Sequence, residues 1–366
     1  MGHRVHMIVP QYDATMEDEE PYVFRFPAID LTNSLNTSLP VPFKSYMEPT
    51  IYGLKPDVIH SQHPFLLGDV AASFAQELRI PLIFTFHSHY DEYPQQYLKF
   101  APEFSSKIVE RIIRKYLEKC THVIAPTPSV RDRIHEFGID VPVSVIPTPI
   151  DFGDYQRLEP DRVRNEYRWD DKTLFLYIGR LSVEKNVKFL LRSFAQIFKA
   201  RTSTRLLIVG DGPEQERLKC LSTELGLGNA VRFMGAVPHS EIPHFAAAAD
   251  LLLFPSMQET QGLVVIEAMA AGTPVVAIQT PELSDVLREG GGRLVNPDEN
   301  DFADEVIALI DDPESLRNLG MRALKVAQKY TMHSAVERLI DVYEQAIEQV
   351  SKPVIKRKLA GPIRLS

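Results

Sequence analysis

Residues 251–278 read LLLFPSMQETQGLVVIEAMAAGTPVVAI, and this stretch indicates the fold class more clearly than any other part of the chain. It opens with an apolar run, Leu251–Phe254, that has the length of a buried strand. A polar loop follows, and an apolar helical segment begins near Gly262. Gly272 ends that segment before a second apolar run, Val275–Ile278. Strand, loop, helix and strand in this order predict a βα unit of a parallel sheet.

Short apolar runs alternate with amphipathic segments along most of the 366 residues. The strands predicted in the first half are Val5–Val9, Val58–His60, Leu82–Phe86, His122–Ala125 and Val143–Ile146. Those predicted in the second half are Leu174–Ile178, Arg205–Val209, Val231–Met234, Leu251–Phe254, Val275–Ile278 and Gly292–Val295. The predicted helices are Asp69–Leu78, Ser105–Lys119, Ser129–Phe137, Val187–Lys199, Glu214–Leu225, Gly262–Ala270, Asp301–Ile310 and Ser334–Gln349. Because the strands of the second half are rich in Val, Ile and Leu without alternation, we expect them to be parallel and covered on both faces. The sequence therefore predicts an α/β protein with two Rossmann-like, doubly wound domains.

The boundary between the two domains is expected near residue 150. Prolines in the stretch Ile146–Asp151 favour an extended connection there. We therefore predict an N-terminal domain over 1–150 and a C-terminal domain over 151–332. Residues 333–366 are predicted to form a helix that crosses back towards the N-terminal domain, followed by a basic tail.

Composition limits the class of protein. A hydrophobic fraction of 44% and a charged fraction of 24% are those of an ordinary soluble globular chain, and the formal net charge of -9 argues against general nucleic-acid binding. No apolar run reaches the length of about 18–20 residues that a transmembrane helix needs, and no signal peptide is recognised. Cys120 and Cys220 lie in no metal or redox spacing, as expected for idle thiols in a reducing compartment. We expect a cytoplasmic protein, with any membrane contact peripheral and on the inner face of the plasma membrane.

Two glutamates flank the start of the predicted helix at Gly262. Glu259 lies in the loop before it, and Glu267 lies within it. Open α/β sheets bind ligands at the carboxyl ends of their strands, and the first helix amides, at Gly262 and Leu263, suit a diphosphate. The carboxylates would then accept hydrogen bonds from a sugar on one side and a ribose on the other. A surface glutamate and an ordinary helix residue are the alternative, which Glu267 makes less attractive because its helix is otherwise strongly apolar.

Two further loops carry glycine after a predicted strand. In the segment YIGRLSVEKN, residues 177–186, Gly179 follows the strand. The cations Arg180 and Lys185 would neutralise a diphosphate there, and a pair of solvated loop cations is the alternative. The segment IVGDGPE around Gly210 has neither the Walker A lysine nor a complete GxGxxG, so tight-turn packing is favoured over phosphate binding.

The stretch Leu174–Pro274 resembles the retaining GT-B glycosyltransferases of family 4. The resemblance is carried by the GRLSxEKN loop, VGDGP, the FMGxV segment Phe233–Val237, and the pair Glu259 and Glu267 within ETQGLVVIEAMAAGTPVV. Gln261 stands where many members have Phe, and the resulting ETQG is similar to the clade that glucosylates diacylglycerol to make membrane glycolipids. The fold that this resemblance implies is GT-B, in which two Rossmann-like domains face a cleft.

The resemblance also implies roles for particular residues. Positions matching Arg180 and Lys185 bind the donor diphosphate, Glu259 matches the residue that contacts the transferred sugar, and Glu267 matches the ribose-binding glutamate. The complete set of donor-binding residues implied in this way is Gly179, Arg180, Lys185, Gly210, Val237, Glu259, Gln261, Gly262, Leu263 and Glu267. No metal and no cofactor is expected, because the cations and amides would stabilise the leaving diphosphate and the nucleotide sugar is itself a substrate.

The first half resembles the family less completely. In FTFHSHYDEY, residues 84–93, His87 matches a histidine near the donor sugar, and with Glu259 it forms the predicted catalytic pair. A histidine at the carboxyl end of a strand is well placed for hydrogen bonding or proton handling. Four histidines lie between residues 60 and 89, but no pair has helical i, i+4 spacing, so a metal site is not favoured. The strand, glycine-rich loop and helix with which the family begins are not found, and a start placed too late, a fragment, a remodelled domain and an inactive paralogue all stay open.

The segment Ser105–Lys119 is predicted to be an amphipathic helix that could lie on an anionic bilayer. A basic tail from Lys352 would add to the attraction. A solvated face of a core helix and a disordered tail are the alternatives. The predicted membrane-facing cations are Lys107, Arg111, Arg114 and Lys115.

The function predicted from the sequence is a metal-independent, retaining hexosyl transfer, of glucose from a UDP-sugar. The expected partners are the nucleotide-sugar donor, a lipid acceptor such as diacylglycerol, and an anionic membrane surface. A mannosyltransferase or another family 4 transferase with a soluble or phosphoinositide acceptor is one alternative. A nucleotide-sugar epimerase or a non-catalytic nucleotide-sugar-binding paralogue is another. The residues themselves leave the sugar, the base, the acceptor and the oligomeric state open.

Overall fold

The computed structural model describes residues 2–11, 21–30, 38–40, 42–90, 102–169 and 171–351. The chain divides into two compact units whose segments alternate along the sequence. Unit 1 comprises Met1–Thr85, Lys115–Val123 and Ile340–Ser366, and unit 2 comprises Phe86–Arg114 and Ile124–Leu339. The basic tail from Lys352 lies outside the described residues, and the domain limits at residues 150 and 332 stay a prediction.

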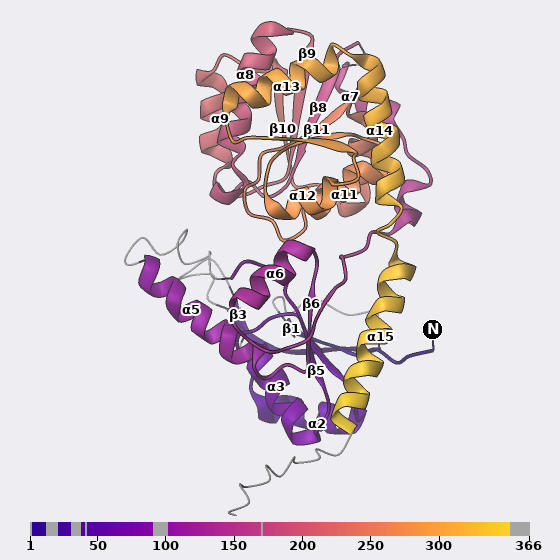
Figure 1. The fold of residues 1–366 in the computed structure, drawn as a ribbon. Coiled ribbons are helices and arrows are strands. Elements are labelled where there is room, and N and C mark those ends of the chain that lie inside the picture. The colour runs from indigo at the N-terminus through magenta and orange to yellow at the C-terminus, as the bar shows by residue number, and fades with distance from the viewer. Residues whose placement is uncertain are drawn as a thin grey trace, which may run out of the picture. The chain divides into compact units, whose positions relative to one another are not determined.

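Unit 2 is built on a six-stranded parallel sheet (Figure 1). Its strands are β8 (Thr173–Ile178), β9 (Thr204–Val209), β10 (Val231–Gly235), β11 (Leu251–Phe254), β12 (Val275–Ile278) and β13 (Gly292–Val295). The order across the sheet is β10-β9-β8-β11-β12-β13, and every neighbouring pair is parallel. The chain therefore builds outward in one direction from β8 and in the other direction from β11, which is the doubly wound order. The prediction of a parallel, doubly wound second half is confirmed.

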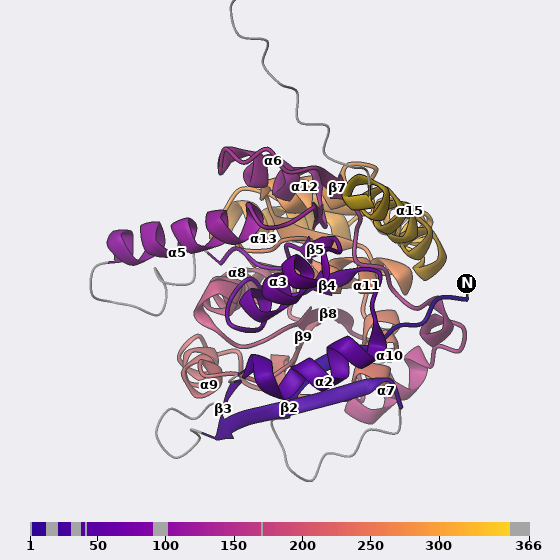
Figure 2. The same ribbon diagram turned by 90° about the horizontal axis from the view of Figure 1, so that it is seen from below.

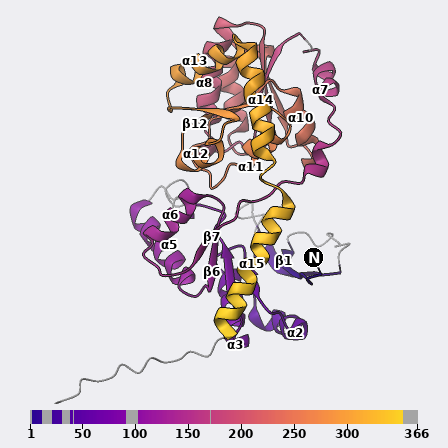
Figure 3. The same ribbon diagram turned by 45° about the vertical axis from the view of Figure 1, so that its right-hand side comes forward.

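Helices cover both faces of this sheet (Figure 3). One face is covered by α8 (Val187–Ala200), α9 (Gln215–Glu224) and α13 (Glu299–Ile310). The other face is covered by α7 (Pro160–Tyr167), α10 (Ile242–Ala248), α11 (Leu263–Ala270), α12 (Pro281–Leu287) and α14 (Pro313–Ala327). Unit 2 also contains α6 (Pro128–Glu136) and the short 3-10 helices η1 (Phe152–Tyr155), η2 (Val183–Lys185), η3 (Gly228–Ala230) and η4 (His239–Glu241).

Alternate residues of each strand enter two separate apolar cores. In β8, Leu174 and Leu176 pack with residues of α10 and α11. Phe175 and Tyr177 of the same strand pack with residues of α8 and α13. All four side chains are completely buried, and burying one such side chain contributes about 1.5–3 kcal/mol. Because both faces are covered, these strands carry none of the polar alternation of a half-exposed sheet.

Unit 1 contains strands of two further sheets. In one, β1 (Met7–Gln11) is parallel to β2 (Val23–Asp30), which pairs antiparallel with β3 (Ser38–Pro40). In the other, the neighbours in order are β4 (Ile59–Ser61), β5 (Leu82–Thr85), β6 (His122–Ala125) and β7 (Val143–Val145). The sequence analysis missed β2, because Pro27 interrupts its apolar run and a proline there argues against a strand.

Two helices pack on the strands of unit 1. The helix α2 (Lys44–Leu54) lies along β2 (Figure 2), and an apolar cluster joins both to α3 (Leu67–Leu78). The centre of this cluster is formed by Phe26, Met47, Ile51 and Phe74.

The helices α5 (Pro102–Leu117) and α15 (Met332–Ser351) each have residues in both units. Within unit 1, the hydroxyl of Tyr343 on α15 lies 2.7 Å from Nδ1 of His60. The other ring nitrogen of His60 lies 2.7 Å from Oγ1 of Thr85. Since His60 belongs to β4 and Thr85 ends β5, this chain of hydrogen bonds fastens the last described helix to two strands of unit 1.

The loops after β8 and β9 touch each other through their backbones. Gly210 has a φ of +132°, and a Cβ atom there would lie 1.9 Å from the carbonyl oxygen of Gly179. A Cβ atom on Gly212 would lie 2.4 Å from the carbonyl oxygen of Leu181. The N–H of Leu181 donates to the carbonyl oxygen of Asp211 at 2.8 Å. Glycine is therefore required for this close approach, as the packing interpretation of IVGDGPE predicted.

We expect Gly210→Ala to lower the free energy of unfolding by about 2 kcal/mol or more beyond Gly226→Ala, because its new methyl group collides with a carbonyl oxygen. Gly226 is a matched control: its φ of +70° is also positive, but nothing lies within 4 Å of a Cβ atom there. Only backbone strain of about 1–2 kcal/mol applies to the control. Urea unfolding followed by circular dichroism measures both, and equal losses would contradict the proposed close contact.

Candidate functional site

The candidate site lies at the carboxyl ends of β8 and β11, between which the strand order reverses. The segment after β8 carries Lys185 in η2, and the loop after β11 carries Glu259. Nζ of Lys185 lies 2.6 Å from Oε1 of Glu259, and these side chains are 24% and 13% exposed. A largely desolvated ion pair therefore joins the two loops across the reversal. The structure brings together two residues that the sequence analysis assigned to one anion site.

Arg180 belongs to the same loop as Lys185 and has an exposed side chain. Its carbonyl oxygen accepts a hydrogen bond from Oη of Tyr177 at 3.1 Å, whereas its guanidinium has no partner among the described residues. Gly179 precedes it with a φ of +152°, and a Cβ atom there would lie 2.9 Å from Oη of Tyr177. The glycine thus allows the tyrosine to hold the loop, while the charge of Arg180 stays available to an anion.

The helix α11 begins without a side-chain cap. Its N-cap is Gly262, with φ 71° and ψ 58°, and no side chain bonds to the amides of the first turn. A Cβ atom at Gly262 would lie 2.8 Å from Cδ2 of Leu283, so a larger residue would collide there. The first N–H groups of a helix have no acceptor within the helix and carry partial positive charge. The amides at Leu263 and the residue after it are therefore suited to an anion, as predicted.

Glu267 is buried within α11. Burial raises the pKa of its carboxyl group, and the nearby His239 partly offsets this effect. Nε2 of His239 lies 3.6 Å from Oε1 of Glu267, and the histidine side chain is exposed. Burial, and after it the charge of Glu267, raises the pKa of Tyr155 in η1. A buried carboxylate near a tyrosine and an exposed histidine is more than the ordinary helix residue that the alternative interpretation assumed.

Thr260 is held from two sides. Its Oγ1 donates to the carbonyl oxygen of His87 at 2.9 Å. Its own carbonyl oxygen accepts from Oγ1 of Thr127 at 3.1 Å. The residue next to Glu259 is therefore fixed by two segments that lie far from it in the sequence.

Gln261 is buried, and both ends of its amide are engaged. Oε1 accepts from the N–H of Thr148 at 2.8 Å, and Nε2 donates to the carbonyl oxygen of Thr148 at 3.0 Å. This two-way contact to the segment before η1 accounts for a glutamine at this position. The direct contact of Gln261 with a donor stays a prediction.

The two histidines after β5 differ in their surroundings. His87 is an exposed residue as a whole, yet burial of its imidazole by the surrounding protein lowers the pKa of this ring. A ring that is neutral near pH 7 is suited to accept a proton, although the catalytic role of His87 stays a prediction. Nε2 of His89 lies 3.1 Å from the carbonyl oxygen of Glu259 and 3.5 Å from Oε1 of Glu282.

The sequence analysis missed four residues that contact or support the loop after β11: His89, Thr127, Thr148 and Glu282. Thr127 carries a visible signal, because a Thr-Pro pair begins α6 and the threonine caps this helix. A second Thr-Pro pair begins α12 in the same way and is followed directly by Glu282. Thr148 is also followed by a proline, but no helix begins at this pair, and His89 carries no comparable signal. Their partners lie 113 and 170 positions away.

The remaining predicted donor residues lie in neighbouring loops. Val237 follows β10, is partly buried, and packs against the core that contains α10 and α11. Gly210 serves the loop contact with Gly179. The donor contacts of Gly179, Gly210 and Val237, like those of the other predicted donor residues, stay predictions.

The helix α5 presents cations and apolar side chains together. Ile108 and Ile112 are 45% and 41% exposed, whereas Ile113 is fully buried. The four cations predicted to face a membrane are all exposed, namely Lys107, Arg111, Arg114 and Lys115. Within the described ranges, no helix combines the length and apolarity that crossing a bilayer requires.

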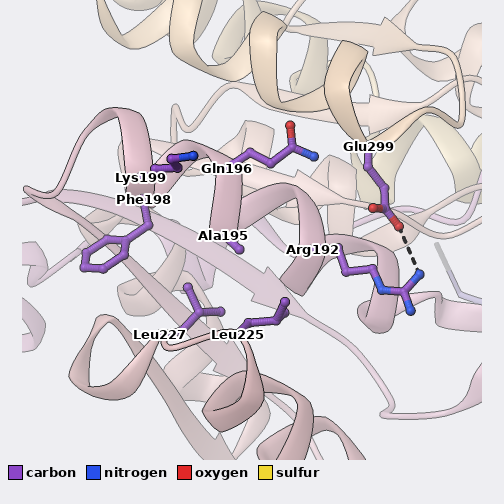
Figure 4. Close-up of a pocket in the computed structure, with 8 residues that line it drawn as sticks. All are labelled: Arg192, Ala195, Gln196, Phe198, Lys199, Leu225, Leu227 and Glu299. Carbon is purple, nitrogen blue, oxygen red and sulfur yellow. Dashed lines mark hydrogen bonds and ion pairs between the residues drawn. The ribbon is translucent and has the colours of Figure 1, made fainter.

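A separate hollow of about 630 Å³ lies among α8, the residues after α9 and the start of α13 (Figure 4). At its edge Nη1 of Arg192 lies 3.4 Å from Oε1 of Glu299. Its apolar lining comes from Ala195, Phe198, Leu225 and Leu227. No predicted site residue lines it, so it does not belong to the candidate site. Among the residues that the structure describes, no group of three or more His, Cys, Asp or Glu could hold a metal ion.

Comparison with solved structures identifies the fold. Sucrose-phosphate synthase from Thermosynechococcus elongatus matches with a TM-score of 0.79 and 22% identity, over 94% of this chain and 89% of that one. HepE from Anabaena, in complex with UDP-glucose, matches with a TM-score of 0.74 and 22% identity, over 88% of this chain and 86% of that one. The fold is that of the GT-B glycosyltransferases.

Sequence comparison identifies the family. The model described as "Glycosyl transferases group 1" matches residues 160–326, and that described as "Glycosyltransferase Family 4" matches residues 1–153. The D-inositol 3-phosphate glycosyltransferase 1 of Catenulispora acidiphila is 31% identical over 80% of this chain and 73% of its own length. The chain belongs to this family of glycosyltransferases, as the sequence analysis predicted.

Two further relatives are named for one activity. The alpha-monoglucosyldiacylglycerol synthase of Streptococcus pneumoniae is 33% identical over 266 residues, which span 70% of this chain and 60% of that protein. The enzyme of the same name from Acholeplasma laidlawii is 25% identical over 98% of this chain and 92% of its own length.

We expect Glu267→Gln to stabilise the chain at neutral pH. Because burial raises the pKa of Glu267 above its ordinary value of 4.5, the folded chain holds this proton more tightly than the unfolded chain does. The contribution of Glu267 to stability therefore falls as the pH rises from the ordinary to the raised pKa, and the whole cost is present above the raised value. The gain in melting temperature of the variant should be largest near about pH 8 and shrink below about pH 5.

Thermal unfolding across this pH range measures the effect. Glu216→Gln is the control, because the side chain of Glu216 is 82% exposed and its ion pair with Lys219 lies at the surface, where such pairs contribute little to stability. A Glu267→Gln variant less stable than the wild type at about pH 8 would contradict the assignment of a buried carboxylate whose burial outweighs the attraction of His239.

Proposed function

We propose that the chain transfers glucose from UDP-glucose to a lipid hydroxyl, such as that of diacylglycerol, with retention of configuration and without a metal ion. The observation that carries the proposal is the ion pair of Lys185 and Glu259 in the loop that leads into the uncapped start of α11. A cation, a carboxylate and free helix amides thereby gather at one edge of the sheet. The diphosphate and sugar of a nucleotide sugar need these three groups.

The charges of the loop fit a leaving diphosphate. When the bond to the sugar breaks, negative charge grows on the phosphate oxygen that departs. The guanidinium of Arg180, the ammonium group of Lys185 and the amides at Gly262 and Leu263 would stabilise this charge in the role that a metal ion has in other transferases. This is why we propose that no metal is required.

The proposed reaction exchanges one bond of the anomeric carbon for another. The bond from this carbon to the diphosphate oxygen breaks, and the oxygen keeps the electron pair. A new bond forms to the oxygen of the acceptor hydroxyl, whose proton is released. UDP-glucose carries its glucose in α linkage, and the names of two relatives specify an alpha-linked glucosyl lipid, which supports retention.

The lipid acceptor is supported by two independent features. Two of the relatives named above are, by their names, synthases of alpha-monoglucosyldiacylglycerol. The helix α5 offers exposed isoleucines beside exposed cations, which is the composition of a helix that lies in the surface of an anionic bilayer. A second candidate acceptor is D-inositol 3-phosphate, because one relative that shows the family is named for it.

A substrate screen tests the proposal. The purified chain is incubated with UDP-glucose, UDP-galactose or GDP-mannose, and with anionic liposomes containing diacylglycerol or with soluble D-inositol 3-phosphate. We expect a glucolipid with an α-anomeric signal in its NMR spectrum, formed equally with and without EDTA. Transfer to inositol phosphate alone would favour the second candidate. Epimerised or free sugar without acceptor would overturn the proposal.

Glu259→Gln and Lys185→Met are expected to differ in their effect on UDP binding, which only Lys185→Met should weaken. Loss of the carboxylate should reduce kcat by about 100-fold or more, as removal of one transition-state contact does. It also releases Lys185 from its partner, so the affinity for UDP should stay equal or rise. Loss of the cation should weaken UDP binding. Titration calorimetry with UDP and initial rates measure both variants, and weaker UDP binding in both would refute this arrangement.

Reversing charge on α5 should weaken membrane binding. We expect the double variant Lys107→Glu with Arg111→Glu to partition at least about tenfold less onto anionic liposomes, since each cation near such a surface contributes about 1 kcal/mol. The control is Arg217→Glu with Lys219→Glu, which changes the net charge equally on the exposed face of α9. Liposome sedimentation compares the two. Equal losses would mean that only the net charge matters.

A further inference from the structure

We infer that His89 is a positioning residue: it holds the backbone of Glu259 through a directed hydrogen bond, so that the carboxylate of Glu259 meets the sugar in the right place. The inference rests on the proposed role of Glu259 in sugar transfer. It assigns a task to a histidine that the sequence pattern left aside in favour of His87.

The geometry requires a hydrogen on one particular nitrogen. Nε2 of His89 lies 3.1 Å from the carbonyl oxygen of Glu259 and 3.5 Å from Oε1 of Glu282. Both of these oxygens are acceptors only, as long as Glu282 is ionised. Nε2 must therefore carry the proton and donate. The side chains of His89 and Glu282 are 8% and 11% exposed, so water competes little for this donor.

Glu282 keeps the ring of His89 oriented. Burial alone would raise the pKa of Glu282, but the hydrogen bond from His89 and further bonds at the start of α12 outweigh burial and lower it. The carboxylate is thus ionised at neutral pH and attracts the Nε2 hydrogen. A buried histidine whose hydrogen is fixed by a carboxylate is a common way to make a donor rigid.

Glu259 is consequently anchored at two points. Its carboxylate is bound by Lys185 at 2.6 Å, and its carbonyl oxygen is bound by His89. The next residue, Thr260, donates to the carbonyl oxygen of His87 at 2.9 Å. The segment from His87 to His89 therefore contacts two consecutive residues of the loop. These contacts hold the predicted catalytic residue His87 and the predicted sugar-binding residue Glu259 in a fixed position relative to each other.

The relative position of these two residues affects the rate of sugar transfer more than the affinity for the donor. A displacement of about 1 Å in a reacting group can reduce the rate about 100-fold. The hydrogen bond of His89 goes to the backbone of Glu259, whereas the cations that would hold the diphosphate lie in the loop after β8. Loss of the hydrogen bond should therefore reduce kcat and leave the KM for the donor nearly unchanged.

Two amide substitutions distinguish a hydrogen-bond donor at the position of Nε2 from a polar side chain that does not reach this position. The amide nitrogen of glutamine reaches the position of Nε2, whereas that of asparagine reaches only the position of Nδ1. We compare His89→Gln, His89→Asn and the wild type in initial rates with the full chain. Hydrogen–deuterium exchange of residues 257–262 and the melting temperature are measured in parallel.

We expect His89→Gln to keep kcat within about threefold, and His89→Asn to lose about tenfold or more with the KM for the donor unchanged. Amides of residues 257–262 should exchange faster only in His89→Asn. Equal kcat losses in both variants, or wild-type exchange in His89→Asn, would overturn the inference. If the wild type transfers no sugar at all, the proposed function fails, while the exchange experiment still decides whether His89 orders the loop.

Discussion

The pairing of β8 with β11 is the constraint on which the candidate site depends. These two strands are neighbours in the sheet although 72 residues separate the end of β8 from the start of β11. The chain leaves them towards opposite edges, so their loops are free of the helices that cover the other strand ends. The ion pair of Lys185 and Glu259 spans this point. Without the reversal, the cationic loop and the acidic loop would not share an edge position.

The glycines and the polar residues around the candidate site have different structural roles. Gly179 and Gly262, and Gly210 in the neighbouring loop after β9, each stand where a Cβ atom would collide with a neighbour. Polar side chains give order, as Thr260 and Gln261 use their hydrogen bonds on distant backbone. The ionisable groups of Arg180, Lys185 and Glu259 are thus presented on a fixed frame. A loop so held by its own polar residues can keep charged groups partly desolvated in one arrangement.

Much of the second half could be predicted from sequence for a physical reason. A parallel sheet that is buried on both faces requires continuous apolar strands, and the loops of βα units require glycine or proline near the strand ends. Both features can be recognised within a few consecutive residues. The local sequence signals of secondary structure are weaker in the first half. Its strand β2 contains Pro27 and its helix α2 contains Pro49, and both residues argue locally against the structures that tertiary packing imposes.

The candidate site divides in the same way. The sequence analysis named Arg180, Lys185 and Glu259 because charged residues after strand ends are a local pattern, and Glu267 because a carboxylate is unusual in an apolar helix. Their roles toward a donor stay predictions. The pairing of Lys185 with Glu259, the clamp of Gln261 on Thr148 and the contact of His89 with Glu259 were not identified, since each joins positions at least 74 apart. Nothing within a short window records which of several polar residues will meet across such a distance.

The chain of hydrogen bonds from Thr85 through His60 to Tyr343 has a consequence for the order in which the protein is made. Translation delivers β4 and β5 early, whereas the helix that completes their packing arrives some 250 residues later. While the ribosome synthesises unit 2, the partly buried imidazole of His60 lacks its tyrosine partner. The strands of the six-stranded sheet in unit 2 are nearly contiguous in sequence, so the packing of this sheet is not delayed in the same way. We therefore expect unit 2 to complete its folding before unit 1 in a nascent chain. The N-terminal strands would stay incompletely packed for the longest time and would be the part most available for binding by a chaperone.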